Sequence, residues 1–217
     1  MEAATPAQTP PEHNYPLTFS VDYPDRELNR LTTFFRIFTV IPIAIVYLTV
    51  AGGGGSGQFH DAFIYAAAGG ALTLGPLLMI LFRRKYPAWW ANWNREFLRF
   101  ASRVGIYAAL MTDEYPSTDE EQSVHLDFPT PNAEEDLSQG LPLVKWFLAI
   151  PHYFALLFLG IGAVFAVIIA WFAILFTGRY PRGLFDYVEG VYRWGLRVEA
   201  YMFILVTDAY PPFSLRA

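Results

Sequence analysis

The sequence predicts a mainly α-helical membrane protein with four transmembrane helices arranged as two parallel tandem repeats. Each repeat would be a helical hairpin followed by an interfacial amphipathic helix, with short cytoplasmic β-strands beside them. Three observations predict this class. Hydrophobic residues make up 54% of the 217 residues and charged residues only 16%, against about 25% charged residues in soluble domains. Aromatic residues reach 18%, as is typical near membrane–water interfaces, and the two halves of the chain repeat one another.

The repeat is a series of motifs that recur in the same order, which indicates a duplicated unit. Four pairs carry it: Val21-Asp22-Tyr23-Pro24 with Leu126-Asp127-Phe128-Pro129, Arg36 and Ile41-Pro42 with Lys145 and Ile150-Pro151, Arg99 and Arg103 with Arg193 and Arg197, and Thr112-Asp113 with Thr207-Asp208. The repeats are assigned to residues 15–117 and 118–217. Residues 1–14 are polar and proline-rich, and we expect a flexible tail that is not a signal peptide.

The first repeat contains two segments with the composition of membrane spans. A transmembrane helix needs about 20 mainly apolar residues, and residues 32–50 and 62–82 meet that requirement. The glycine-rich stretch 52–61 separates them and predicts the tip of a hairpin.

The second repeat is less clear, because its apolar segments 143–159 and 161–176 are almost continuous. A single helix over both is the alternative, with a length of about 50 Å against a hydrocarbon core of about 30 Å. By analogy with the first repeat, we expect a tight turn near Gly160 and Gly162.

Charge distribution predicts the orientation. All 15 Lys and Arg residues lie outside the two expected hairpin tips. The positive-inside rule then places both termini and the middle segment in the cytoplasm. With an even number of spans in each repeat, the repeats would be parallel and related by an axis along the membrane normal.

Residues 87–110 and 181–205 predict amphipathic helices that lie in the interface, with aromatic residues on one face and arginine on the other. The arginine pairs Arg99/Arg103 and Arg193/Arg197 are four residues apart, so each pair shares one face. Two interpretations stay open for these cations, namely contact with anionic lipid headgroups or a structural lock with repeated carboxylates. The carboxylates are Asp22, Asp127, Asp113 and Asp208.

Residues 17–21 and 124–126 predict short strands, from their rough alternation and β-branched content. Three ionisable residues, Arg36, Lys145 and His152, fall within expected spans, where such residues are candidates for function. The position of His152 is occupied by isoleucine in the first repeat, which favours a structural role for the histidine.

No motif predicts catalysis, a metal site or a cofactor. Cysteine is absent, and the four histidines lack metal-ligand spacing. Acidic residues outnumber basic ones, which argues against nucleic acid as a partner.

Several motifs resemble one family. The stretch Leu175-Phe176-Thr177-Gly178-Arg179-Tyr180-Pro181, the following Arg182-Gly183-Leu184-Phe185, and the terminal Tyr210-Pro211-Pro212-Phe213 are similar to the domain of unknown function 4389, a family of bacterial integral membrane proteins. The resemblance covers nearly the whole chain after the tail, although Arg83-Arg84-Lys85 and Trp89-Trp90 in the first repeat depart from it. It implies a multi-pass protein of the bacterial cytoplasmic membrane, and it implies no activity or catalytic residue.

The sequence therefore favours a non-enzymatic integral membrane scaffold or accessory subunit that contacts anionic lipids, a membrane protein complex or another copy of itself. A small oligomeric transporter or channel is the alternative. A lipid-modifying enzyme is a third hypothesis, with chemistry among Asp113, Asp208 and the arginine pairs.

Overall fold

The structure, a computed structural model, describes residues 15–51 and 71–216, with side chains of residues 71–74 also outside the description. The predictions for the N-terminal tail and for the hairpin tip at residues 52–61 lie outside these residues. The elements in chain order are β1 (Thr18–Val21), α1 (Arg30–Phe34), α2 (Arg36–Val50), α4 (Ala71–Arg83), α5 (Ala88–Ala108), β2 (Val124–Asp127), a 3-10 turn (Leu141–Leu143), α6 (Lys145–Leu148), α7 (Ile150–Thr177), α8 (Arg182–Glu199) and a π-helical turn (Ala200–Ile204).

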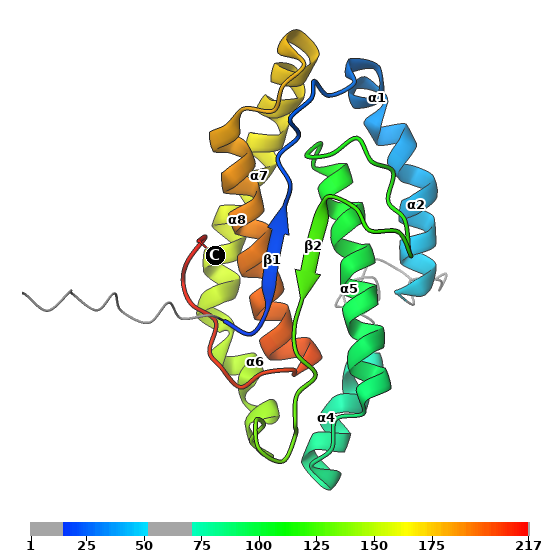
Figure 1. The fold of residues 1–217 in the computed structure, drawn as a ribbon. Coiled ribbons are helices and arrows are strands. Elements are labelled where there is room, and N and C mark those ends of the chain that lie inside the picture. Colours follow the sequence, from blue (N-terminus) through cyan, green and yellow to red (C-terminus); the bar gives the residue numbers. More distant parts are fainter. Residues whose placement is uncertain (1–14, 52–70, 217) are drawn as a thin grey trace, which may run out of the picture.

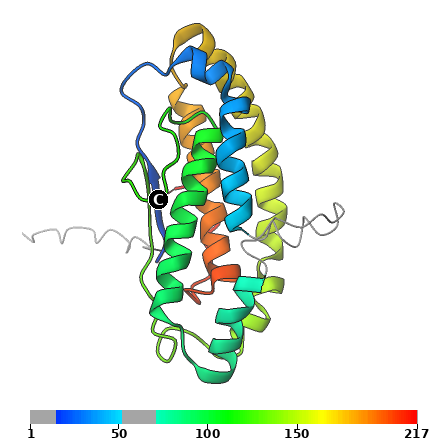
Figure 2. The same ribbon diagram turned by 90° about the vertical axis from the view of Figure 1, so that its right-hand side faces the viewer.

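These elements form three layers (Figures 1 and 2). The two-stranded antiparallel sheet of β1 and β2 is the first layer. Helices α5 and α8 form the middle layer, and α2 and α7 form the third, on the side away from the sheet. The sheet lies near the middle of the long axis of the molecule, so it runs alongside the helices and does not cap one end.

An approximate two-fold axis relates the two repeats. The motif alignment makes Ser20 the counterpart of His125, and these two residues are paired directly across the sheet. Both are exposed while their neighbours are buried, so the axis passes between them, perpendicular to the sheet. Accordingly, α5 runs opposite to α8, and α2 runs opposite to α7 (Figure 1).

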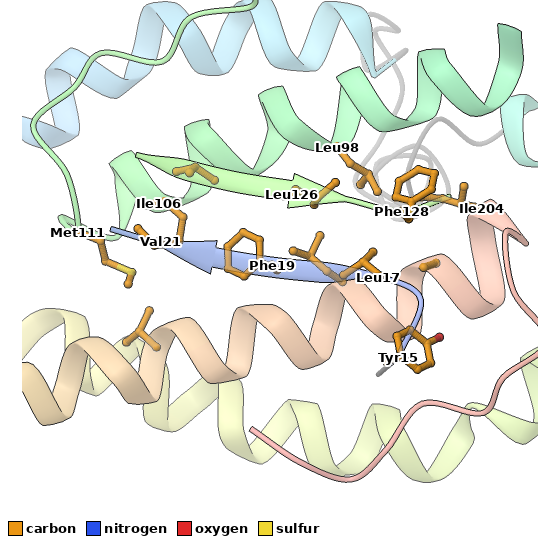
Figure 3. Close-up of a cluster of buried hydrophobic side chains, with 14 of the residues drawn as sticks. Tyr15, Leu17, Phe19, Val21, Leu98, Ile106, Met111, Leu126, Phe128 and Ile204 are labelled. Carbon is orange, nitrogen blue, oxygen red and sulfur yellow. The ribbon is translucent and has the colours of Figure 1, made fainter. Parts of the chain in front are cut away.

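The repeats interlock around this axis. Strand β1 packs on α8 of the second repeat, and β2 packs on α5 of the first. Figure 3 shows the resulting core, in which Leu17, Phe19 and Val21 of β1 share one cluster with Leu126 of β2 and with Leu98 and Ile106 of α5. Because alternate residues of a strand point to opposite faces, each strand presents this apolar row to the helices and its polar row outward.

The predicted fold class is wrong in its main feature, because residues 15–51 and 71–216 do not form four transmembrane helices. Among the described residues, one helix, α7, is long and apolar enough to cross a membrane. It runs without interruption through Gly160 and Gly162, where the sequence predicted a turn. With 28 residues, α7 is about 42 Å long. The alternative of a single helix is therefore correct from Ile150 onward, whereas the residues before it form the 3-10 turn and the short helix α6.

The glycine at position 162 has a packing role that explains the error. A Cβ atom there would lie 2.5 Å from the hydroxyl of Tyr187 on α8. That hydroxyl donates a hydrogen bond to the carbonyl of Leu159, at 2.9 Å. Glycine is therefore needed for close approach of α8 to α7, and it does not mark a turn.

The first repeat also differs from a hairpin. Helices α2 and α4 run in the same direction along the long axis (Figures 1 and 2), whereas the arms of a hairpin run in opposite directions. The two repeats are antiparallel along that axis, so the expected parallel arrangement of transmembrane hairpins is wrong as well.

The predicted strands lie at β1 and β2, and the predicted amphipathic helices lie at α5 and α8. Pro87 and Pro181 precede these helices with extended backbone, as expected for proline at a helix start. The two helices are covered on both sides, however, since the sheet lies over the face that carries the arginines. They are an interior layer, and the interfacial placement predicted for them is wrong.

Candidate functional site

A buried ion pair fixes the first long helix of the first repeat. Arg36, at the start of α2, is 3% exposed, and its Nη2 donates to Oδ1 of Asp113 at 2.6 Å. The guanidinium lies 3.9 Å from the centroid of the Tyr107 ring. The other carboxylate oxygen of Asp113 accepts a hydrogen bond from the backbone N–H of Asn29 at 2.6 Å. We call this group the Arg36 lock.

The second repeat contains the equivalent arrangement, which we call the Lys145 lock. Lys145 is fully buried at the start of α6, with its Nζ 2.7 Å from Oδ1 of Asp208. Nζ also donates to the carbonyl of Thr207 at 2.7 Å and lies 4.8 Å from the Tyr201 ring centroid. Oδ2 of Asp208 accepts from the backbone N–H of Ser138 at 2.5 Å. The cation, the aromatic ring, the carboxylate and the backbone N–H each have a counterpart in the Arg36 lock.

Both locks join the same three parts of a repeat. The cation stands at the start of the helical segment in the third layer. The aromatic ring comes from the end of α5 in the Arg36 lock and from the π-helical turn after α8 in the Lys145 lock. In both locks the carboxylate comes from the segment that follows the aromatic residue. The cation is shielded from water, so its attraction to the carboxylate is stronger than on the surface. This arrangement holds the middle and third layers together in both repeats.

The arginine pairs of α5 and α8 donate hydrogen bonds to backbone carbonyls. Arg99 donates to the carbonyl of Leu126 at 2.8 Å, and Arg193 donates to the carbonyl of Phe19 at 2.8 Å. The first arginine of each pair thus ties its helix to the sheet. Arg99 also pairs with Glu96 at 2.8 Å, and Arg193 pairs with Glu189 one turn earlier on α8.

The second arginine of each pair fixes a segment that follows its helix. Arg103 donates to the carbonyl of Ser117 at 2.9 Å, and Arg197 donates to the carbonyl of Arg216 at 3.0 Å. Both side chains are buried. Neither arginine pair contacts Asp22, Asp113 or Asp208. Of the four predicted carboxylates, only Asp127 lies near one of these arginines, at 3.4 Å from Arg99.

The remaining predicted carboxylates are on the surface. Asp127 lies 3.1 Å from Arg95 and 3.4 Å from Arg99, with 67% of its side chain exposed. Asp22 lies 2.9 Å from the exposed His125. Exposed ion pairs of this kind contribute about 0–1 kcal/mol to the stability of the fold, so we expect them to stabilise it less than the buried locks do.

His152 is fully buried near the start of α7. Its Nδ1 accepts a hydrogen bond from the indole N–H of Trp194 at 3.0 Å, and its ring stacks on Phe213 at a centroid distance of 4.1 Å. The residue joins α7 to α8 and to the C-terminal segment. Within residues 15–51 and 71–216, no group of three His, Asp or Glu side chains could hold a metal ion.

Part of the chain matches a known family. Residues 142–214 match the family described as "Domain of unknown function (DUF4389)". This part of the chain is a DUF4389 domain. The match contains Lys145, Tyr201 and Asp208 of the Lys145 lock and the arginines of α8, whereas Ser138 lies just before it. No curated protein and no solved structure matches the chain.

Outside these polar contacts, the DUF4389 domain and the first repeat share a continuous apolar surface, which we call the apolar face. Its large exposed side chains recur every three or four residues along α1, α2, α6 and α7. They include Leu31, Phe34, Ile37, Phe38, Ile41, Ile45 and Leu48 from the first repeat, and Phe147, Phe154, Leu157, Phe158, Ile161, Val164, Phe165, Ile168, Phe172 and Phe176 from the second. The face belongs to the third layer, opposite the sheet (Figure 2).

Proposed function

We propose that the protein is a membrane-bound scaffold or accessory subunit that seats its apolar face in one leaflet of the bilayer. The observation that supports this most strongly is α7. A core helix of a soluble protein would be mostly buried, but only 17% of the most apolar window of α7 is buried within the protein. Large exposed apolar patches mark surfaces that contact membranes or other proteins.

The energy available from this face is large. Full burial of a Leu, Ile or Phe side chain contributes about 1.5–3 kcal/mol, and these side chains are roughly half to three-quarters exposed. Each would therefore contribute roughly 1 kcal/mol on entering an apolar medium. The face has many such side chains, so their sum would be far larger than the association of a single lipid chain with a membrane.

The charges beside α7 favour an orientation in which this helix lies along the membrane. The hydroxyl of Tyr187 donates a hydrogen bond to the carbonyl of Leu159, so this part of α8 lies beside the central part of α7. The residue before Tyr187 is Asp186, whose exposed carboxylate pairs with Arg182 at 3.0 Å. If α7 crossed the bilayer, this exposed ion pair would lie at the depth of the hydrocarbon. A single charge at a helix centre there costs at least about 2.5–3.5 kcal/mol.

The position of the sheet favours the same orientation of the protein relative to the membrane. The sheet lies alongside the helices with Asp22, His125 and Asp127 exposed, so charged and polar groups are exposed at the sheet, on the side opposite the apolar face. Seating the apolar face in one leaflet leaves that polar side in water. There it would be accessible to a protein partner, as the scaffold role requires.

Single-cysteine labelling tests this proposal cleanly, because the sequence contains no cysteine. Nitroxide labels are attached separately at Phe154→Cys, Phe165→Cys and Phe176→Cys along α7, and at Ser20→Cys on the outer side of the sheet. The protein is reconstituted in vesicles of phosphatidylcholine and phosphatidylglycerol. Collisions with oxygen and with a water-soluble nickel chelate are then measured by EPR.

The expected result is similar depth for the three α7 labels, all accessible to oxygen, while the label at position 20 meets the nickel chelate. A steep gradient of depth from position 154 to position 176 would refute the orientation. Exclusion of both reagents at all three α7 positions would mean that protein covers the face, as in a pair of copies, and would refute seating in lipid.

A further inference from the structure

An open cavity of about 480 Å³ lies where the two repeats meet in the helical layers. Tyr47 of α2 and Leu156 of α7 line it, together with residues of α5 and α8. The two-fold axis passes through this region, and the alignment of Arg36 with Lys145 makes Tyr47 the counterpart of Leu156. The volume falls in the range of about 300–1,000 Å³ that is usual for small-molecule sites.

The lining is largely apolar but contains four polar side chains, those of Tyr47, Ser102, Tyr192 and Glu199. Ser102 is fully buried, and its Oγ has no hydrogen-bond partner among the described residues. Buried polar groups are nearly always hydrogen-bonded, so one without a partner requires an explanation. Within the described part of the chain, the carboxyl of Glu199 also lacks a basic side chain at ion-pair distance.

The architecture of the repeat does not require these polar groups. Each has an apolar counterpart across the axis: Tyr47 corresponds to Leu156, Ser102 to Leu196, Tyr192 to Leu98, and Glu199 to Gly105. The carboxyl of Glu199 and the hydroxyl groups around it are therefore additions to the shared frame. They give the cavity one negative charge and several hydrogen-bond acceptors inside an apolar wall.

We propose that this cavity is a binding site for a small amphiphile with a protonated amine as its head and an alkyl chain as its body. The ammonium would donate hydrogen bonds to Glu199 and to the oxygen of Ser102, and the aromatic rings of Tyr47 and Tyr192 add cation–π attraction. The alkyl chain would lie against the apolar part of the wall. The site goes beyond seating in the membrane and does not depend on it.

Protonation of Glu199 gives the binding a predictable pH dependence. Burial raises the pKa of Glu199 to about 7. The other titratable groups that line the cavity are Tyr47 on α2 and Tyr192 on α8, and burial raises the pKa of both phenols above 10. They stay neutral from pH 5.5 to 8, and an alkylamine stays cationic there. Amine affinity should therefore rise about thirtyfold over this range, following the ionised fraction of Glu199.

Two glycines of α8 allow a substitution that fills part of the cavity and a matched control outside it. A Cβ at Gly195 on α8 would meet open space within 4 Å, and Gly195 lines the cavity, so the side chain of Gly195→Leu would extend into it. Gly183 on α8 also has open space around its Cβ, but it is exposed and is not part of the cavity. Both substitutions favour helix over glycine, so both variants should fold.

The test is calorimetric titration of octylamine, 1-octanol and octanoate into the protein in nanodiscs, with empty nanodiscs as the blank. The expected result is a saturable site for octylamine that tightens from pH 5.5 to 8, with octanol at least tenfold weaker. Gly195→Leu should abolish it, Gly183→Leu should leave it intact, and Glu199→Gln should remove its pH dependence. Equal affinity for amine and alcohol, octylamine binding that survives Gly195→Leu, or no saturable octylamine site would each overturn the proposal.

Discussion

Replacing Asp208 with asparagine should destabilise the protein more than any comparable change at a surface carboxylate. The substitution keeps the shape of the side chain and leaves an oxygen that can still accept from the N–H of Ser138, but it removes the negative charge beside Lys145. Lys145 is fully buried, so its ammonium would lose its counter-charge without gaining water. Breaking a buried pair in this way costs about 3–5 kcal/mol.

Asp127→Asn is the matched control, because the chemical change is the same and this carboxylate is 67% exposed. It should cost less than about 1 kcal/mol. Urea denaturation in a mild detergent, followed by tryptophan fluorescence, measures both values under one condition. Addition of Lys145→Met to Asp208→Asn should recover much of the lost stability, since the double variant buries no unpaired charge. Equal stability of the Asp208→Asn and Asp127→Asn variants would refute the role assigned to the Lys145 lock.

Three further perturbations follow from the structure. Glu199, whose pKa rises from 4.5 to about 7 on folding, favours the folded state most below pH 4.5, and roughly 2.5 kcal/mol of stability is lost between pH 5 and pH 8. Denaturation of Glu199→Gln at these two pH values should lack that loss. Gly178→Ala forces alanine to a φ of +75° and should cost about 1 kcal/mol, whereas Gly183→Ala should not destabilise. His152→Ala leaves the Trp194 N–H unpaired and should cost about 2–4 kcal/mol with changed tryptophan fluorescence; unchanged stability would contradict the buried contact.

Local patterns in the sequence were sufficient for several elements. Alternation identified the strands around Phe19 and Leu126, and the positions of Pro87 and Pro181 marked the starts of α5 and α8. The motif alignment also placed Arg36 and Lys145 at matching positions, and Asp113 and Asp208 likewise. These features depend on short stretches of chain, where periodicity and backbone preferences decide the local structure.

The sequence did not predict which residues contact each other when they are far apart in the chain. Nothing in it says that Asp113 meets Arg36 and not Arg99 or Arg103, because each choice is equally complementary in charge. Gly162 misled for a related reason, since glycine serves both turns and close contacts, and Tyr187 lies in a different helix. Exposure is also a property of the assembled layers, so the arginine face of α5 could not be recognised as covered before β2 was placed on it.

The pairing of Ser20 with its own counterpart His125 has an evolutionary consequence. In a homodimer with two-fold symmetry, a residue on the axis meets the same residue of the other subunit. The present chain has that geometry within one polypeptide, which is the outcome expected when the gene of a half-length ancestor is duplicated and fused. In such an ancestor, every group had to occur twice, so a carboxyl at the position of Glu199 would have been present in both subunits. Fusion would remove that constraint and allow a single acid, with Gly105 at the equivalent position of the first repeat.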